Sequence, residues 1–185
     1  MHVCERNVTA IGDPQAPDAA VLAPSSGGRT VVSVDAHVEG AHFTRALAER
    51  LDAICALSVR EAEAGDRPRP GVVLVAPGDR HLEFDASGAV QLGDGPLVHG
   101  CRPAADVAML SAARVYRQRT IGVVMTGMGK DGAAGALAIR RAEGRTFAQD
   151  EASSAIFGMP KAAIDAGAIE EVLPLDAIAS RLRYV

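Results

Sequence analysis

The sequence of 185 residues contains no tryptophan, and aromatic side chains make up only 3% of it. Its formal net charge is −4 at pH 7, so it has neither the basic surface nor the stacking rings with which proteins commonly bind nucleic acid. The cysteines Cys4, Cys55 and Cys101 lie far apart, which predicts reduced thiols rather than a disulfide framework or a zinc site. The histidines also lack metal-ligand spacing. We therefore expect no metal, no cofactor and no nucleic-acid partner.

Long apolar runs are missing as well. The densest run, residues 72–76, has the length of a strand, whereas a membrane helix needs about 18 apolar residues. The first residues lack the charged-then-apolar layout of a secretory signal. We therefore expect a cytoplasmic protein without direct membrane insertion. Its length and its apolar fraction of 48% predict a single domain, residues 1–185, with a substantial core.

Short β-branched runs alternate with longer segments of helical period, which predicts βαβ units. Most of the runs are almost continuously apolar, as strands covered on both faces should be. The expected fold is therefore a three-layer α/β/α architecture with a mostly parallel, doubly wound sheet. The predicted strands are residues 8–11, 30–34, 57–60, 72–75, 121–125, 145–148 and 169–173.

Apolar residues at helical spacing predict helices over residues 43–54 and 109–116, and Pro103 opens the second of these. A third helix is predicted over residues 131–143 and ends before Gly144. Residues 81–84 and 89–92 flank Ser87-Gly88, which predicts an antiparallel hairpin at a sheet edge. The first 40 residues are rich in turn formers, and we expect only a short helix there, at residues 17–22.

The segment from Val123 to Gly132 is the strongest candidate for chemistry. A buried strand ends in a Gly-x-Gly turn and a helix follows an aspartate, Asp131. Ligands of open α/β sheets bind beyond the carboxyl ends of the strands. Asp131 could cap the helix that follows it or act as a catalytic carboxylate, and the residues alone leave both open. His37 follows the predicted strand 30–34 at the same edge, where it could form a base–orienter pair with Asp131.

Several motifs occur in a fixed order from residue 43 onward. They are Val59-Arg60-Glu61-Ala62, Val75-Ala76-Pro77-Gly78-Asp79-Arg80-His81-Leu82, Arg102-Pro103-Ala104-Ala105-Asp106-Val107, Thr126-Gly127-Met128-Gly129-Lys130-Asp131-Gly132-Ala133, and Ala148-Gln149-Asp150-Glu151-Ala152 followed by Phe157-Gly158-Met159-Pro160. With these motifs the sequence resembles the catalytic domain of the chemoreceptor methylesterase family (CheB). The resemblance implies a three-layer serine hydrolase that removes methyl esters from receptor glutamates and, in some members, deamidates receptor glutamines. It also implies a partner, the cytoplasmic helices of methyl-accepting chemotaxis proteins.

The resemblance further implies a Ser–His–Asp triad at the carboxyl edge of the sheet. Asp131 matches its aspartate, Met128 matches an active-site methionine, and His37 matches its histidine by strand position. Phe43 lies one residue farther from His37 than in the family pattern. The rim of the site would also include Gly12, Gln15, Gly127 and Gly129.

The sequence departs from the family at the serine. Members follow Ile-Gly with Ala-Ser-Thr-Gly-Gly, whereas Ile11-Gly12 is followed here by Asp13-Pro14-Gln15-Ala16-Pro17. Pro14 takes the place of the serine and has neither a hydroxyl group nor a backbone N–H. Loss of a triad serine in a comparable hydrolase costs about 10⁶ in kcat. We therefore predict a catalytically impaired domain, a pseudo-enzyme that binds receptor. This chain also has Cys101-Arg102-Pro103 where family members have His-Arg-Pro.

The alternative is an active methylesterase and glutamine deamidase with a substitute nucleophile. Ser26 lies too few residues before His37 to leave room for the helix and strand that separate serine and histidine in the family. Asp13 stands beside the vacated position, although aspartate is also favoured before proline in turns. Cys101 has neither a helix N-terminus nor a base beside it in the sequence. Family members commonly carry an N-terminal receiver domain, and we expect none here, because few residues precede the first predicted strand.

Overall fold

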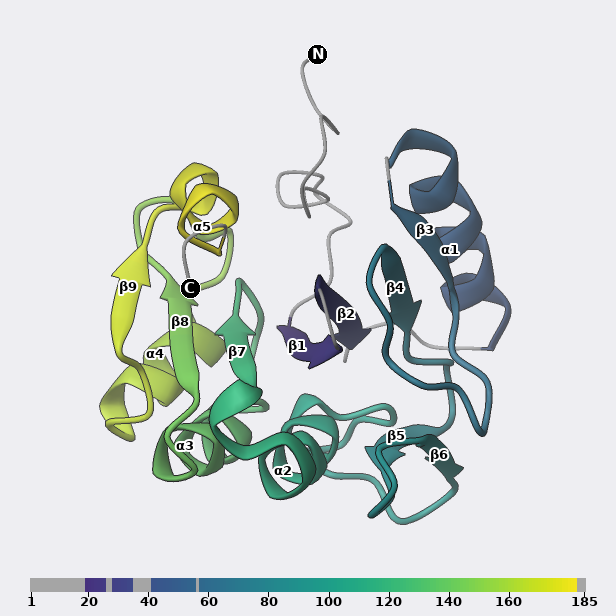
Figure 1. The fold of residues 1–185 in the computed structure, drawn as a ribbon. Coiled ribbons are helices and arrows are strands. Elements are labelled where there is room, and N and C mark those ends of the chain that lie inside the picture. The colour runs from purple at the N-terminus through teal and green to yellow at the C-terminus, as the bar shows by residue number, and fades with distance from the viewer. Residues whose placement is uncertain (1–18, 26–27, 35–40, 56, 183–185) are drawn as a thin grey trace.

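A seven-stranded sheet forms the centre of the molecule (Figure 1). The computed structural model describes residues 19–25, 28–34, 41–55 and 57–182, with side chains from residue 43 onward. The strand order is β3-β4-β2-β1-β7-β8-β9. The bounds are β1 (Ala19–Ser25), β2 (Gly28–Val34), β3 (Ser58–Glu61), β4 (Val72–Val75), β7 (Ile121–Val124), β8 (Arg145–Gln149) and β9 (Glu171–Leu173).

All the strands of this sheet run parallel except β1, which is antiparallel to both of its neighbours, β2 and β7. Ala19, at the start of β1, is paired with Val34 of β2 and with Val124 of β7. The carboxyl ends of β2 and β7 therefore lie at one edge of the sheet, with the start of β1 between them. This edge is the expected place of the active site.

Helices cover both faces of the sheet (Figure 1). Successive residues of β7 point to opposite faces, because Val124 belongs to the same apolar cluster as Met109 and Ile139, whereas Val123 clusters with Phe147 and Ile178. The helices of the first face are α2 (Ala105–Tyr116), followed by the 3₁₀ turn η1 (Arg117–Arg119), α3 (Ala133–Arg141) and α4 (Met159–Asp165), and those of the second are α1 (Ala41–Ile54) and α5 (Leu175–Leu182). The predicted α/β fold with a mostly parallel sheet is confirmed.

The predicted hairpin is present, but not at an edge of the main sheet. Its strands, β5 (His81–Phe84) and β6 (Val90–Gly93), form a separate two-stranded antiparallel sheet. The hairpin packs on α2, where the ring of Phe84 meets that of Tyr116 edge-on at 5.2 Å. The hydroxyl of Tyr116 also donates a hydrogen bond to the carbonyl of Gly88 in the hairpin turn. Burial against α2 therefore draws the hairpin away from the sheet.

The short helix predicted at residues 17–22 is wrong for residues 19–22, which belong to β1. Ser25 is paired with Gly28, so only two residues connect β1 to β2. Strands on both sides supply partners for the backbone of β1, and this pairing outweighs the local turn composition. The predicted strand 8–11 lies outside the described residues.

The longest described helix, α1, has 14 residues, and none of the helices in the described ranges is long and apolar enough to span a membrane.

Candidate active site

Asp131 is almost completely buried, with 3% of its surface exposed, in the turn between β7 and α3. Its Oδ2 accepts a hydrogen bond from the backbone N–H of Ala105 at 2.7 Å, and its Oδ1 accepts two more, from Asp106 at 2.8 Å and Gly132 at 2.9 Å. Ala105 and Asp106 are the first two residues of α2, whose N–H groups have no partner inside that helix. Asp131 therefore caps α2, a helix that precedes it in the chain, rather than α3.

Asp106 makes the reciprocal contact. Its Oδ1 accepts a hydrogen bond at 2.7 Å from the backbone N–H of Gly135, in the first turn of α3. A Cβ atom at Gly135 would lie 2.3 Å from the Cβ of Met109, so glycine is needed for α3 to approach α2 this closely. The sequence analysis missed Asp106, although its acidic side chain lies in the first turn of the helix after Pro103, where carboxylates are favoured.

A third side chain joins this pair. Nε2 of His99 lies 2.8 Å from Oδ2 of Asp106. One ligand atom from each of His99, Asp106 and Asp131 lies within 4.8 Å of the others, a spacing that a metal ion could bridge. Both carboxylates, however, already accept backbone N–H groups from the ends of α2 and α3. Helix capping accounts for their position, and we assign no metal to them.

The electrostatics of Asp131 follow from its burial. Removal from water raises the pKa of the Asp131 carboxyl above its ordinary value, and the neighbouring carboxylate of Asp106 adds to the rise, while the three backbone N–H donors oppose it. A carboxylate has about four acceptor positions, and backbone N–H groups use three of them here. Oδ2 accepts only one hydrogen bond from the described residues, so it can also accept the N–H of an imidazole, as an orienting carboxylate does.

The turn before Asp131 is anchored to the chain after β8 by Gln149. Its buried side chain accepts a hydrogen bond from the backbone N–H of Thr126 at 2.9 Å and donates one to the carbonyl of Ser153 at 2.7 Å. The sequence analysis gave Gln149 no role, although it lies in one of the motifs. The feature that marks Gln149 is its burial at the end of β8, and the sequence motif does not show burial.

A second set of contacts holds the same turn. Gly127 donates its backbone N–H to the carbonyl of Ile156 at 3.0 Å, and Gly127 and Phe157 form a parallel β-bridge. A Cβ atom at Gly158 would lie 2.7 Å from the carbonyl oxygen of Gly127, so glycine permits this approach. The turn that contains Asp131 is therefore fixed from two sides.

The described residues include only part of the predicted site. Gly127, Met128, Gly129 and Asp131 lie in the turn that follows β7, at the carboxyl edge of the sheet. Outside the described residues lie Gly12, Asp13, Pro14, Gln15, Ser26 and His37. The pairing of His37 with Asp131 and the loss of the nucleophile at Pro14 stay predictions.

Cys101 lies in the loop between the β5–β6 hairpin and α2. It forms an antiparallel bridge with Val98, and its Sγ lies 3.8 Å from the carbonyl oxygen of His99. The same loop leads into the N-terminus of α2 at Ala105. The role of Cys101 as a substitute nucleophile stays a prediction, because its Sγ lies beside the backbone carbonyl of His99, whereas the imidazole of His99 binds Asp106.

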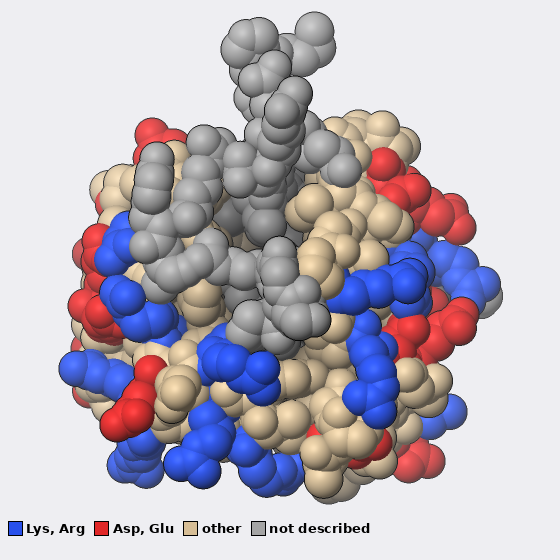
Figure 2. All heavy atoms as spheres, viewed as in Figure 1, with Lys and Arg blue, Asp and Glu red and all other residues tan. Residues whose placement is uncertain are grey.

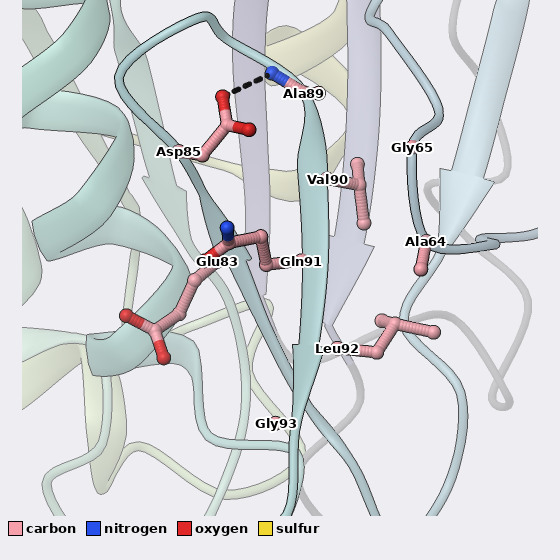
Figure 3. A pocket seen from close by; sticks show the side chains of 9 residues that line it. All are labelled: Ala64, Gly65, Glu83, Asp85, Ala89, Val90, Gln91, Leu92 and Gly93. Carbon is pink, nitrogen blue, oxygen red and sulfur yellow. Dashed lines mark hydrogen bonds between the residues drawn. The ribbon is translucent and has the colours of Figure 1, made fainter.

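A hollow of about 430 Å³ lies elsewhere, along the β5–β6 hairpin (Figure 3). Asp85 turns toward the hairpin turn and accepts a hydrogen bond from the backbone N–H of Ala89, while Val90 and Leu92 lie on the side of Ala64. None of the candidate residues in the described part of the chain lines this hollow. It is therefore separate from the site around Asp131.

Comparison with known proteins decides the family. A family model described as CheB methylesterase matches residues 14–182, a range that contains both His37 and Asp131. The chain belongs to the CheB methylesterase family. The CheB methylesterase catalytic domain of Thermotoga maritima has a similar structure, with a TM-score of 0.77 and 41% identity over 82% of this chain and 80% of that one.

Curated CheB relatives give the same assignment. A protein-glutamate methylesterase/protein-glutamine glutaminase of Symbiobacterium thermophilum is 50% identical over 76% of this chain, and one of Pseudomonas aeruginosa is 53% identical over 76%. These matches span only 39% and 41% of the relatives' own lengths. The chain thus corresponds to about two fifths of the CheB proteins that it matches. Neither the family match nor the relatives show that catalysis has been lost.

Proposed function

We propose that this chain is a protein-glutamate methylesterase and glutamine glutaminase domain that acts on the cytoplasmic helices of chemoreceptors. Relatives of that name are about half identical to it. The observation that carries the proposal is the buried carboxylate of Asp131 in the turn after β7, whose Oδ2 accepts only one hydrogen bond from the described residues. In this proposal Asp131 orients a catalytic histidine and stabilises its protonated form.

We assign that histidine to His37. β2 ends at Val34, at the same edge as the end of β7, and only β1 separates the two strands. At about 4.8 Å between neighbouring strands, β2 and β7 are about 10 Å apart, a gap that a histidine three residues beyond Val34 can bridge. In the reaction, the imidazole takes the proton of the nucleophile as it attacks the ester carbonyl and passes that proton to the departing methanol, and water then releases the acyl group. Glutamine would release ammonia by the same steps.

If Pro14 takes the place of the family's serine, as the motif predicts, the nucleophile of an active enzyme comes from another residue. Ser26 is disfavoured, because too few residues separate it from His37 for the helix and strand that lie between serine and histidine in the family. Cys101 is better placed, since its loop carries His99 and leads to the helix that Asp131 caps. Cys101 and Asp13 are therefore the substitutes to test first.

A second candidate function is a receptor-binding domain with impaired catalysis. The feature in its favour is Pro14, which follows Asp13 after Ile11-Gly12, where the resemblance predicts the serine, and which has neither hydroxyl nor N–H. This candidate keeps the fold and the receptor partner of the first and differs from it only in the rate of hydrolysis.

Methanol release from methyl-esterified receptor separates the two candidates. The chain is compared with the Thermotoga maritima catalytic domain and with its own Pro14→Ser variant. A rate within about tenfold of the Thermotoga domain supports the active enzyme, and Cys101→Ala and Asp13→Asn then identify the nucleophile. The impaired domain is supported if the wild-type rate is at least about 10³-fold below that of the Thermotoga domain and the Pro14→Ser substitution raises it. Both candidate functions would be rejected if neither the wild-type chain nor its Pro14→Ser variant bound receptor or released methanol.

A further inference from the structure

Two large apolar side chains are exposed at the candidate site. Met128 is 67% exposed and Ile156 is 51% exposed. They belong to two segments that are far apart in the sequence but joined by the β-bridge between Gly127 and Phe157. Met128 lies three residues before Asp131. Met128 and Ile156 therefore each lie next to this bridge, beside the turn that carries Asp131, and we call them the apolar rim.

The backbone of Ile156 is held firmly although its side chain faces solvent. The hydroxyl of Thr126 accepts the N–H of Ile156 at 2.8 Å and donates to its carbonyl at 3.1 Å. The carbonyl of Ile156 also accepts the N–H of Gly127 at 3.0 Å. These contacts fix where the side chain emerges, yet its exposure means that it contributes little burial to folding. A fixed, exposed apolar group on the rim of a site suits contact with a ligand.

We propose that Ile156 is a specificity-determining residue that, together with Met128, contacts the methyl group of a glutamate methyl ester. This inference rests on the proposed function. An ester ends in an apolar methyl group, whereas the amide of glutamine ends in an NH₂ group that loses its water against an apolar wall. The rim therefore favours ester over amide. Burial of one methyl group corresponds to about 0.8 kcal/mol, or about fourfold.

The test compares two substitutions of the same kind. Ile156→Asn places a polar group on the rim. Ile54→Asn is the matched control, because Ile54 is 57% exposed at the end of α1, near the start of β3 and therefore at the opposite edge of the sheet. The readout is the ratio of kcat/KM for methanol release to kcat/KM for ammonia release, on receptor carrying the methyl ester or glutamine. Ile156→Val serves as the conservative variant.

We expect Ile156→Asn to lower the ester-to-amide ratio about four- to tenfold, with Ile54→Asn and Ile156→Val within about twofold of the wild type. An unchanged ratio in a folded Ile156→Asn chain would overturn the specificity role while leaving the proposed function intact. Absence of turnover by the wild type would instead contradict the proposed activity. In that case the ester-to-amide ratio is measured from the Kd values of helical receptor peptides that carry the methyl ester or glutamine. The same shift in Ile156→Asn supports the inference, and an unchanged ratio refutes it.

Discussion

At the scale of single residues, the site depends on two aspartates that cap each other's helices. Asp131 follows β7 and binds the first N–H groups of α2, while Asp106 in α2 binds an N–H group of α3. Each carboxylate thus fixes the position of the other. The interpretations of Asp131 as a cap and as a catalytic carboxylate are compatible, since capping uses three acceptor positions and leaves one.

Asp131→Asn should destabilise the folded chain by about 1–3 kcal/mol. The asparagine oxygen can still accept hydrogen bonds, but its NH₂ group would face a backbone N–H that also donates, and a buried donor would lose its partner. The measurement is urea unfolding at pH 7. Asp94→Asn is the control, because the exposed Asp94 carboxylate makes no hydrogen bond with the described residues, and it should change stability by less than about 0.5 kcal/mol. Equal losses in both variants would rule out the capping role.

At the scale of elements, the strand ends are joined by side chains rather than by strand pairing. Gln149 at the end of β8 connects the turn after β7 to Ser153, and the hydroxyl of Ser153 accepts the N–H of Leu175 at the start of α5. Three consecutive βα connections are thereby linked. This arrangement fixes the turn that carries Asp131.

Gln149→Leu should cost about 2 kcal/mol or more, because it leaves the N–H of Thr126 and the carbonyl of Ser153 without their partner. Hydrogen exchange should show the change locally, with faster exchange of the Thr126 amide. Gln118→Leu, on the exposed turn η1, supplies the control and should leave that amide unaffected. Unaltered exchange at Thr126 in the Gln149 variant would contradict the linking role.

The connection after β3 gives a pH-dependent prediction. Arg60 and Asp66 form a two-pronged ion pair with both N–O distances at 2.6 Å, and this contact with Arg60 lowers the pKa of the Asp66 carboxyl below its ordinary value of 3.8. The folded state therefore holds the proton more weakly than the unfolded chain. The resulting stability is present above pH 3.8 and is lost as the pH falls through the lowered pKa.

Asp66→Asn should accordingly reduce the free energy of unfolding by about 1–2 kcal/mol at pH 7, a value that allows for partial exposure of the pair to solvent. The difference from the wild type should shrink toward zero at about pH 2–3. Asp165→Asn breaks an exposed pair with Lys161 and should cost less than about 0.5 kcal/mol at either pH. A difference for Asp66→Asn that stayed constant with pH would count against the ion pair.

At the scale of the whole molecule, local sequence patterns predicted where most strands lie, but they did not predict strand pairing or contacts between distant segments. Strand β4 has the predicted bounds, 72–75, because a short apolar run between turn residues has few other conformations. β1 was missed, since only its pairing with β2 and β7 makes residues 19–25 extended. The contacts of Asp106 and Gln149 span 29 and 23 residues and depend on helix placement, which no local pattern contains.

A group of basic side chains lies away from Asp131, although the exposed Lys130 is its neighbour in the chain. Figure 2 shows basic side chains gathered on the lower part of the visible face, in the region of α2 and α3 in Figure 1. The exposed arginines at the C-terminal ends of these elements are Arg114, Arg117, Arg119, Arg140 and Arg141. Asp131 lies at the N-terminal end of α2. The basic surface is therefore not part of the proposed chemistry.

The most direct test of the assignment is the rate of methanol release after Asp131→Asn, measured in whichever of the wild-type and Pro14→Ser chains hydrolyses methyl-esterified receptor faster. With Asp131 as the carboxylate that orients the histidine, the rate should fall about 10⁴-fold while receptor binding is retained. A folded Asp131→Asn chain that releases methanol within about tenfold of its parent would contradict the account, because Asp131 would then be a helix cap alone.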